Sequence, residues 1–189
     1  MILIDLPGHG QSDRPNQPAD YGLRRLVTVV TDVLDTLEIE QAAVLGYSFG
    51  GWVVHGLALY QPDRLSSALL LDGFPAEGDD VGLRAYITND QSLTEAERQS
   101  RMVLADWAAM ELATILEQVN NLLPNFSVPC LLLNSEFPTN SFEANFIQRS
   151  AQHIPNNTHQ VFAGYGHADL LTNSKVIVPY IKQFLTPSH

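Results

Sequence analysis

The chain has 189 residues, of which 45% are hydrophobic and 16% charged, so we expect one folded domain and exclude a disordered protein. Its formal net charge of −11 would repel a phosphate backbone, which excludes general nucleic-acid binding. The single cysteine, Cys130, excludes a disulfide framework and a cysteine-based zinc site, and no apolar run is long enough to span a bilayer. We therefore expect a cytoplasmic protein with no nucleic-acid or membrane partner, and the sequence leaves its oligomeric state open.

Short apolar runs alternate with helical stretches, which is typical of an α/β protein with a mostly parallel sheet of about five strands. The runs show little polar alternation, as expected when helices cover both faces of the sheet. The predicted strands are Ile2–Asp5, Ala42–Leu45, Ala68–Leu71, Cys130–Leu133 and Gln160–Ala163. The predicted helices are Tyr21–Leu37, a stretch from just after Ser48 to Tyr60, Phe142–His153 and Ser174–Leu185. We expect Pro179 to kink or split the last of them.

A long insertion, residues 73–128, separates the third and fourth predicted strands. The turns 75–80 and 122–125 bracket a helical middle that carries Met102, Trp107 and Met110. A connection of this length usually has its own structure or a function such as covering a site. We therefore divide the chain into a core, residues 1–72 and 129–189, and an insertion, residues 73–128.

The strongest motif is Gly46-Tyr47-Ser48-Phe49-Gly50-Gly51, between a predicted strand and a predicted helix. This is the setting of the Gly-x-Ser-x-Gly nucleophile elbow, in which the serine occupies a strained strand-to-helix turn. Glycines two residues on either side would let the strand and the helix pass closely, and the turn would raise the Ser48 hydroxyl above the sheet. The Phe49 N–H would then bind a developing oxyanion at the helix N-terminus.

With this motif, the chain as a whole resembles the α/β-hydrolase fold family, in its serine hydrolase group with a helical cap. The resemblance rests on the elbow and on further segments in the family's order: Asp5–Pro15, Leu57–Leu65, Ala68–Asp72 and Gly164–His167. It implies that residues 73–128 form the cap, and that Trp107, Met102 and Met110 line an apolar substrate pocket. The alternative for these three side chains is simple packing.

Among the six histidines, His167 is the best candidate for the general base. It lies four residues past the last predicted strand, at the carboxyl end where parallel sheets place their sites. His55 is seven residues after Ser48 on the same helix, about 10 Å along its axis and too far for a hydrogen bond. We assign the remaining four to structural or solvated positions: His9, His153, His159 and His189. No group of histidines and carboxylates has the spacing of metal ligands.

The acid that would orient His167 is less clear. In the resembled family it usually follows the fourth of these strands by a few residues, but here Phe137 or Pro138 stands at that position and Glu136 comes one or two places early. Asp72, directly after the third predicted strand, is the position that some family members use. We favour Asp72 over Glu136 because it needs no remodelled turn. A lost acid is the third alternative.

The start of the chain raises two further points. Gly8-His9-Gly10 imitates a dinucleotide-binding turn, but Asp13 stands at the third glycine position and Pro15 interrupts the helix, so we expect no cofactor. The resemblance also implies three strands before Ile2, one of which would lie between Ile2–Asp5 and Ala42–Leu45. Without it, the sheet must close up or borrow a strand. We therefore expect the natural enzyme to be longer than this chain.

These features predict a serine hydrolase that cleaves a small ester, thioester or related acyl substrate through an acyl-enzyme on Ser48. Because the elbow residue is serine, the resemblance argues against haloalkane dehalogenase and epoxide hydrolase chemistry, whose relatives carry aspartate there. Cleavage of a carbon–carbon bond and cofactor-free perhydrolysis use the same residues and stay open. The alternative from another class is a non-catalytic or truncated relative that binds a small apolar ligand or a partner.

Overall fold

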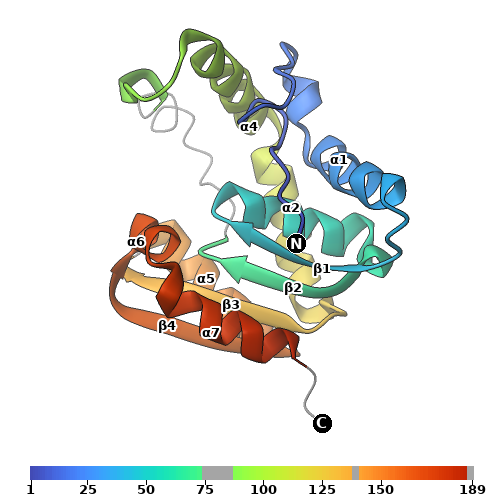
Figure 1. The fold of residues 1–189 in the computed structure, drawn as a ribbon, viewed down its shortest axis with the longest axis vertical. Helices are drawn as coiled ribbons and strands as arrows, with labels where there is room; N and C mark the ends of the chain where they lie inside the picture. The colour runs from blue at the N-terminus through green and yellow to red at the C-terminus, as the bar shows by residue number, and fades with distance from the viewer. Residues whose placement is uncertain (74–86, 138–140, 187–189) are drawn as a thin grey trace.

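The structure is a computed structural model that describes residues 1–73, 87–137 and 141–186, without the side chains of residues 108–116, 141–144 and 146. This part of the chain forms a parallel four-stranded sheet with helices on both faces (Figure 1), which confirms the α/β class. In sheet order, the strands are β1 Ala42–Tyr47, β2 Leu65–Leu71, β3 Cys130–Phe137 and β4 Asn157–Gly166. The helices are η1 Pro18–Tyr21, α1 Leu23–Thr36, α2 Phe49–Tyr60, η2 Pro62–Arg64, α4 Glu95–Leu122, η3 Leu123–Asn125, α5 Ser141–His153, α6 His167–Thr172 and α7 Ser174–Leu185.

Two hydrophobic clusters lie on opposite faces of the sheet because alternate residues of a strand point to opposite sides. The larger cluster joins α1, α2 and part of α4 to one face, where Leu70 and Leu132 are buried. The smaller cluster joins α6 and α7 to the other face, where Leu69 and Leu131 are buried. Helices therefore cover both faces of the central strands, as their continuous apolar sequence predicts.

The register of the sheet aligns the carboxyl ends of its first three strands. Tyr47 at the end of β1 pairs with Leu71 at the end of β2, and Leu71 pairs with Leu133 in β3. The residues that follow these positions therefore meet at one edge of the sheet. This is the edge where open parallel sheets place their functional sites.

The prediction of a fifth strand at Ile2–Asp5 is wrong for this structure. Residues 1–6 have no strand or helix, although Ile4 and Leu6 pack against the larger cluster. In the described residues, the sheet neither closes up with this segment nor borrows a strand, and Leu45 on β1 is 44% exposed. A strand needs a neighbour for its main-chain hydrogen bonds, and an apolar sequence alone does not provide one.

The expected helical middle of residues 73–128 is α4, a helix of 28 residues. Thr94 and Glu97 begin it with a capping box, and Val119 near its carboxyl end is buried in the larger cluster. The predicted turn 122–125 is the end of α4 and η3, whereas the turn 75–80 lies outside the described residues. The division into a core and a cap stays a prediction.

Pro179 does not split the last helix, since α7 continues through it. Proline removes one main-chain hydrogen bond, but Ile177 of α7 is buried against the sheet, with Ile181 and Phe184 packed beside it. This packing holds the helix together across the missing bond. No helix of the described chain is long and apolar enough to cross a membrane.

Candidate active site

Ser48 occupies the sharp turn between β1 and α2. Its backbone has φ 49° and ψ −117°, an uncommon conformation for a residue other than glycine. Its N–H donates to Leu71 O at 3.1 Å, and its carbonyl accepts from Gly51 N at 2.9 Å. The sheet edge and the first turn of α2 thus hold the strained residue, as the elbow motif predicts.

Close backbone approach requires two glycines of the motif. A Cβ on Gly46 would lie 2.3 Å from Gly50 O, and a Cβ on Gly51 would lie 2.3 Å from the Gly73 Cα. A Cβ on Gly50 would meet nothing within 4 Å. The steric explanation for glycines on both sides of Ser48 therefore holds for Gly46 and fails for Gly50, and Gly51 is the second restricted position.

Asp72 and His167 meet at the carboxyl end of the sheet. Asp72 follows β2 and is fully buried, whereas His167 begins α6 with its side chain 19% exposed. The His167 Nδ1 lies 3.3 Å from Asp72 Oδ2. Because the carboxylate accepts, Nδ1 carries the proton and Nε2 carries the lone pair of the neutral imidazole. This tautomer is the one that a general base needs.

The other oxygen of Asp72 is bound by the end of β3. Ser135 N donates to Asp72 Oδ1 at 2.8 Å, and Asn134 Nδ2 donates to it at 3.3 Å. Asn134 is itself buried, and its Oδ1 accepts from His159 Nε2 at 3.1 Å. These bonds compensate for the cost of burying a carboxylate and fix its orientation toward His167.

Ser48 is joined to His167 through its neighbour Tyr47. The Tyr47 and His167 rings stack with centroids 4.8 Å apart, and the Tyr47 hydroxyl donates to the His167 carbonyl at 3.3 Å. Asp72 in turn follows Leu71, whose carbonyl accepts from Ser48 N. The structure therefore brings the three polar residues to one edge of the sheet, from three separate parts of the chain.

Glu136, the alternative acid, is exposed near the end of β3. Its Oε2 accepts from Gly164 N at 2.7 Å, so it holds the end of β4 just before α6. Asp169 has a similar local role, since its Oδ2 accepts from Gly166 N at 2.8 Å. The choice between Asp72 and Glu136 as catalytic acid stays a prediction, and the hydrogen bond to His167 favours Asp72.

Phe49 is the first residue of α2, and its ring packs against the N-terminal turn. The rings of Phe49 and His9 stack with centroids 5.9 Å apart. His9 Nδ1 donates to Pro7 O at 3.1 Å, and burial lowers the pKa of His9, which favours the neutral ring with its lone pair on Nε2. The first N–H groups of a helix have no partner within the helix, and the role of the Phe49 N–H as an oxyanion donor stays a prediction.

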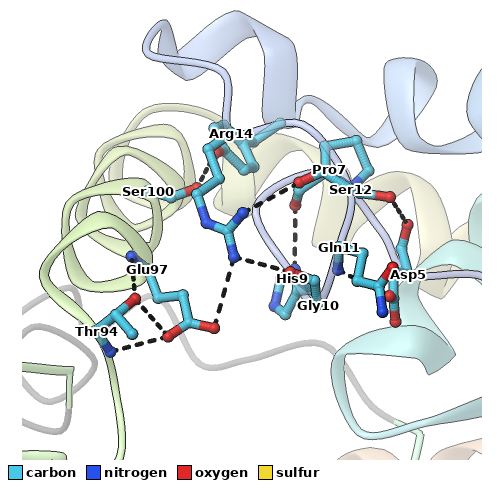
Figure 2. Close-up of polar contacts among 11 residues, drawn as sticks. Asp5, Pro7, His9, Gly10, Gln11, Ser12, Arg14, Thr94, Glu97 and Ser100 are labelled. Carbon is cyan, nitrogen blue, oxygen red and sulfur yellow. Dashed lines mark hydrogen bonds and ion pairs between the residues drawn. The ribbon is translucent and has the colours of Figure 1, made fainter.

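Figure 2 shows how the N-terminal turn is attached to α4. Arg14 donates to Gly10 O at 2.8 Å and forms an ion pair with Glu97 at 3.5 Å. Ser100 on the same helix hydrogen-bonds the Tyr21 hydroxyl, and a Cβ on Gly8 would lie 2.6 Å from the Ser100 Oγ. The turn that carries His9 is therefore packed directly on the helix of the predicted cap.

The three predicted substrate-binding side chains have different surroundings. Trp107 is 2% exposed within the larger cluster, which fits the packing alternative, while Met102 is half-buried on α4. The Met110 side chain lies outside the described residues. Their contact with a substrate stays a prediction.

The remaining histidines and the cysteine have structural surroundings. His55 is fully buried, its Nδ1 bonds to Gly51 O at 2.8 Å, and burial lowers its pKa to about 4. Burial raises the pKa of Cys130 to about 12, so the thiol stays protonated and is a poor nucleophile. His153 is exposed, and His189 lies outside the described residues.

Sequence reasoning missed Tyr47, Asn134 and Ser135. Each lies at the carboxyl end of a strand, where the rule that selected His167 also applies. Asn134, which directly follows the apolar run Cys130–Leu133, was therefore detectable as a polar residue at the sheet edge. The stacking of Tyr47 on His167 could not be detected from the sequence, because it depends on where α6 begins.

Residues 1–160 match the family model described as the alpha/beta hydrolase fold. The chain belongs to the alpha/beta hydrolase fold family. A structural neighbour, an alpha/beta hydrolase enzyme from a deep-sea metagenome library of the Medee basin, has a TM-score of 0.78 and 18% identity, covering 98% of this chain and 78% of that one. At this identity the likeness shows the alpha/beta hydrolase fold alone.

Two curated relatives show how far the sequence similarity extends. This alpha/beta hydrolase is 30% identical over 95 residues to a putative 2-succinyl-6-hydroxy-2,4-cyclohexadiene-1-carboxylate synthase of Bacillus subtilis, covering 50% of the chain and 35% of the relative. It is 26% identical over 122 residues to epoxide hydrolase 2 of Siraitia grosvenorii, covering 62% of the chain and 38% of the relative. The matches thus span little more than a third of each relative.

Proposed function

We propose that this chain is a serine hydrolase that cleaves small ester, thioester or related acyl substrates. The observation that carries the proposal is the hydrogen bond of 3.3 Å between His167 Nδ1 and the buried Asp72, beside the strained turn of Ser48. A serine on an elbow, an imidazole and a buried carboxylate are the three groups that nucleophilic acyl transfer uses.

The proposed reaction has two stages. Ser48 Oγ attacks the substrate carbonyl while its proton passes to His167 Nε2, and the Phe49 N–H binds the oxygen that becomes negative. The tetrahedral intermediate collapses to an acyl-enzyme when His167 gives this proton to the leaving group. Water then attacks the acyl group and passes a proton to His167 Nε2, which returns it to Ser48 Oγ as the carboxylic acid leaves.

Asp72 supports both stages without itself accepting a proton. Its Oδ2 keeps the His167 proton on Nδ1, so Nε2 faces the reaction in the basic form. When His167 becomes an imidazolium, the negative carboxylate stabilises it. Two donors from β3 hold Oδ1, so the carboxylate needs little rearrangement during the reaction.

The residue at the elbow separates this proposal from epoxide hydrolysis. The family's epoxide hydrolases resemble this chain but use an aspartate at the position of Ser48. A serine attacks an acyl carbon and gives an ester that water hydrolyses readily. We therefore propose an acyl substrate despite the similarity to epoxide hydrolase 2.

Labelling with a fluorophosphonate probe tests the nucleophile directly. Attack by Ser48 Oγ on phosphorus would release fluoride and leave a covalent phosphonate, which intact mass and peptide mapping locate. We expect labelling of the wild-type chain and none of Ser48→Ala. Ser66→Ala is a matched control, because Ser66 is an exposed serine at the opposite end of β2 and should label like the wild type.

Hydrolysis of p-nitrophenyl acetate and butyrate tests turnover. We expect release of p-nitrophenol by the wild type and by Ser66→Ala, and loss of at least about a thousandfold in Ser48→Ala. Wild-type protein that binds p-nitrophenyl butyrate but neither labels nor turns over would support the non-catalytic alternative. Labelling at another residue would contradict the assignment of Ser48.

A further inference from the structure

Tyr47 contacts His167 in two ways that the proposed chemistry does not yet use. Its ring stacks on the imidazole with centroids 4.8 Å apart and planes 20° apart, and its hydroxyl donates to the His167 carbonyl at 3.3 Å. We propose that Tyr47 is a positioning residue that fixes the plane of the His167 imidazole toward Ser48. This role rests on the proposed function, and it makes the rate of that reaction depend on Tyr47 as well.

A hydrogen bond to Asp72 cannot orient the imidazole by itself. It holds Nδ1 at one point, but the ring can still tilt about the line between Nδ1 and Asp72 Oδ2, as far as its bond to Cβ allows. Such a tilt would turn the Nε2 lone pair out of the direction from which the proton of Ser48 must arrive. A nearly parallel aromatic ring against the face of the imidazole opposes this motion. Tilting the imidazole would pull one of its edges off the Tyr47 ring and push the other edge into it.

The chain position of Tyr47 couples the base to the nucleophile. Tyr47 is the last residue of β1 and is joined by one peptide bond to Ser48. Its pairing with Leu71 fixes this strand end, and the Leu71 carbonyl also accepts from Ser48 N. A small displacement of the strand end therefore moves the nucleophile and the ring that supports the base together, which preserves their relative geometry.

The stack also matches the charge that develops during the reaction. The face of a phenol ring is negative, so it attracts the imidazolium that forms when Ser48 gives up its proton. The carboxylates of Asp169 and Glu136 near the end of β4 already accept from main-chain amides of Gly166 and Gly164. Asp72 and Tyr47 both contact the His167 ring, so both would stabilise the positive charge that it gains.

Two variants separate the ring from the hydroxyl. Tyr47→Leu removes the stack and should lower kcat for p-nitrophenyl butyrate by about ten- to a hundredfold, because misplaced catalytic groups lose rates of this size, with KM within about twofold. Tyr47→Phe keeps the ring and should lose only about threefold, from the hydroxyl bond. Tyr180→Leu is the matched control, since Tyr180 is a tyrosine of α7 that packs edge-on against Phe162 and should leave kcat unchanged.

Active-site titration and NMR distinguish positioning from a structural role. Titration with the fluorophosphonate gives the fraction of competent sites, so kcat is compared per site. The ring current of Tyr47 should shift the His167 Hε1 resonance, and the shift should persist in Tyr47→Phe and vanish in Tyr47→Leu. If Tyr47→Leu does not fold, Tyr47→Met replaces it, because methionine has similar length without an aromatic face.

Each outcome bears on one claim. A per-site kcat in Tyr47→Leu or Tyr47→Met within twofold of the wild type would overturn the positioning role, as would equal losses in Tyr47→Phe and Tyr47→Leu. A wild-type chain that neither labels nor hydrolyses the ester would overturn the proposed function instead. In that case the ring-current shift would still report whether the stack exists, and its absence from wild-type spectra would overturn the present inference.

Discussion

Two polar networks of this alpha/beta hydrolase use the same kinds of bonds in opposite surroundings. The network of Asp72 is buried, with Asp72 fully inaccessible and bound by groups from β3 and α6. The network of the N-terminal turn (Figure 2) is partly open to solvent. The side chains of its ion pair, Arg14 and Glu97, are 31% and 25% exposed. An unpaired carboxylate is costly in the first setting and is hydrated in the second.

The networks also differ in what assembles them. The turn forms most of its bonds locally, as when Gln11 N and Ser12 Oγ donate to the side chain and carbonyl of Asp5. Asp72 instead collects partners that lie 62 to 95 residues away in sequence. The buried network therefore requires the whole sheet, and we expect its mutations to have larger effects than those of the turn.

The largest effect should come from removing the charge of Asp72. Asp72→Asn keeps the shape but offers a donor or a weaker acceptor to His167 Nδ1, so the imidazole loses its basic tautomer. We expect kcat for p-nitrophenyl butyrate to fall by about four orders of magnitude. Glu136→Gln, which removes the charge of the alternative acid, should change kcat by less than about threefold. A larger loss in Glu136→Gln would assign the acid to Glu136.

Burial of His55 should make the fold sensitive to acid. In the unfolded chain its pKa is the ordinary 6.5, whereas in the folded chain burial lowers the pKa to about 4. Between these values the unfolded state binds more protons, so stability falls as the pH drops through this window, by up to about 3 kcal/mol.

Urea unfolding between pH 4 and 7 measures this effect. His55→Leu should show a shallower loss of stability below pH 6.5 than the wild type, whatever its stability at pH 7. His153→Leu, which replaces an exposed histidine, is the control and should keep the wild-type slope. Identical slopes in His55→Leu and the wild type would show that His55 does not cause the acid sensitivity.

Asn134 tests the support of the buried carboxylate. Asn134→Leu removes one of the two donors to Asp72 Oδ1 and the acceptor of His159, and this loss at a buried carboxylate should cost about 1–3 kcal/mol of unfolding free energy. His159→Leu should cost less, because His159 is exposed and water replaces its bond. Urea midpoints measure both, and an equal or larger loss in His159→Leu would contradict the explanation by burial.

The exposed pair of the turn should give the smallest effect. We expect the same urea midpoint, within the error of the measurement, for Arg14→Met, Glu97→Gln and the double variant. The reason is that water and salt screen such pairs. A coupling free energy between Arg14 and Glu97 as large as the unfolding free energy lost in Asn134→Leu would contradict this explanation. Solvent exposure would then not be the reason why the two networks differ in their contribution to stability.

Local patterns in the sequence determined the elements of the fold. Four of the predicted strands and the flanking helices follow from apolar runs and helical periodicity, as in the buried face of α1 formed by Leu26, Val30 and Leu34. The elbow was also readable, because Gly46 and Ser48 stand in a fixed order between a strand and a helix. These features depend on neighbours a few residues apart.

Only the tertiary structure decided which distant residues meet. Ile2–Asp5 is as apolar as the real strands, but strand formation requires a partner that an apolar run does not specify. The sequence likewise left Asp72 and Glu136 open, and the register of β2 with β3 and the start of α6 put the hydrogen bond of His167 on Asp72. Periodicity reports the burial of each residue along the chain, whereas side-chain contacts arise from the packing of separate elements, which no local pattern contains.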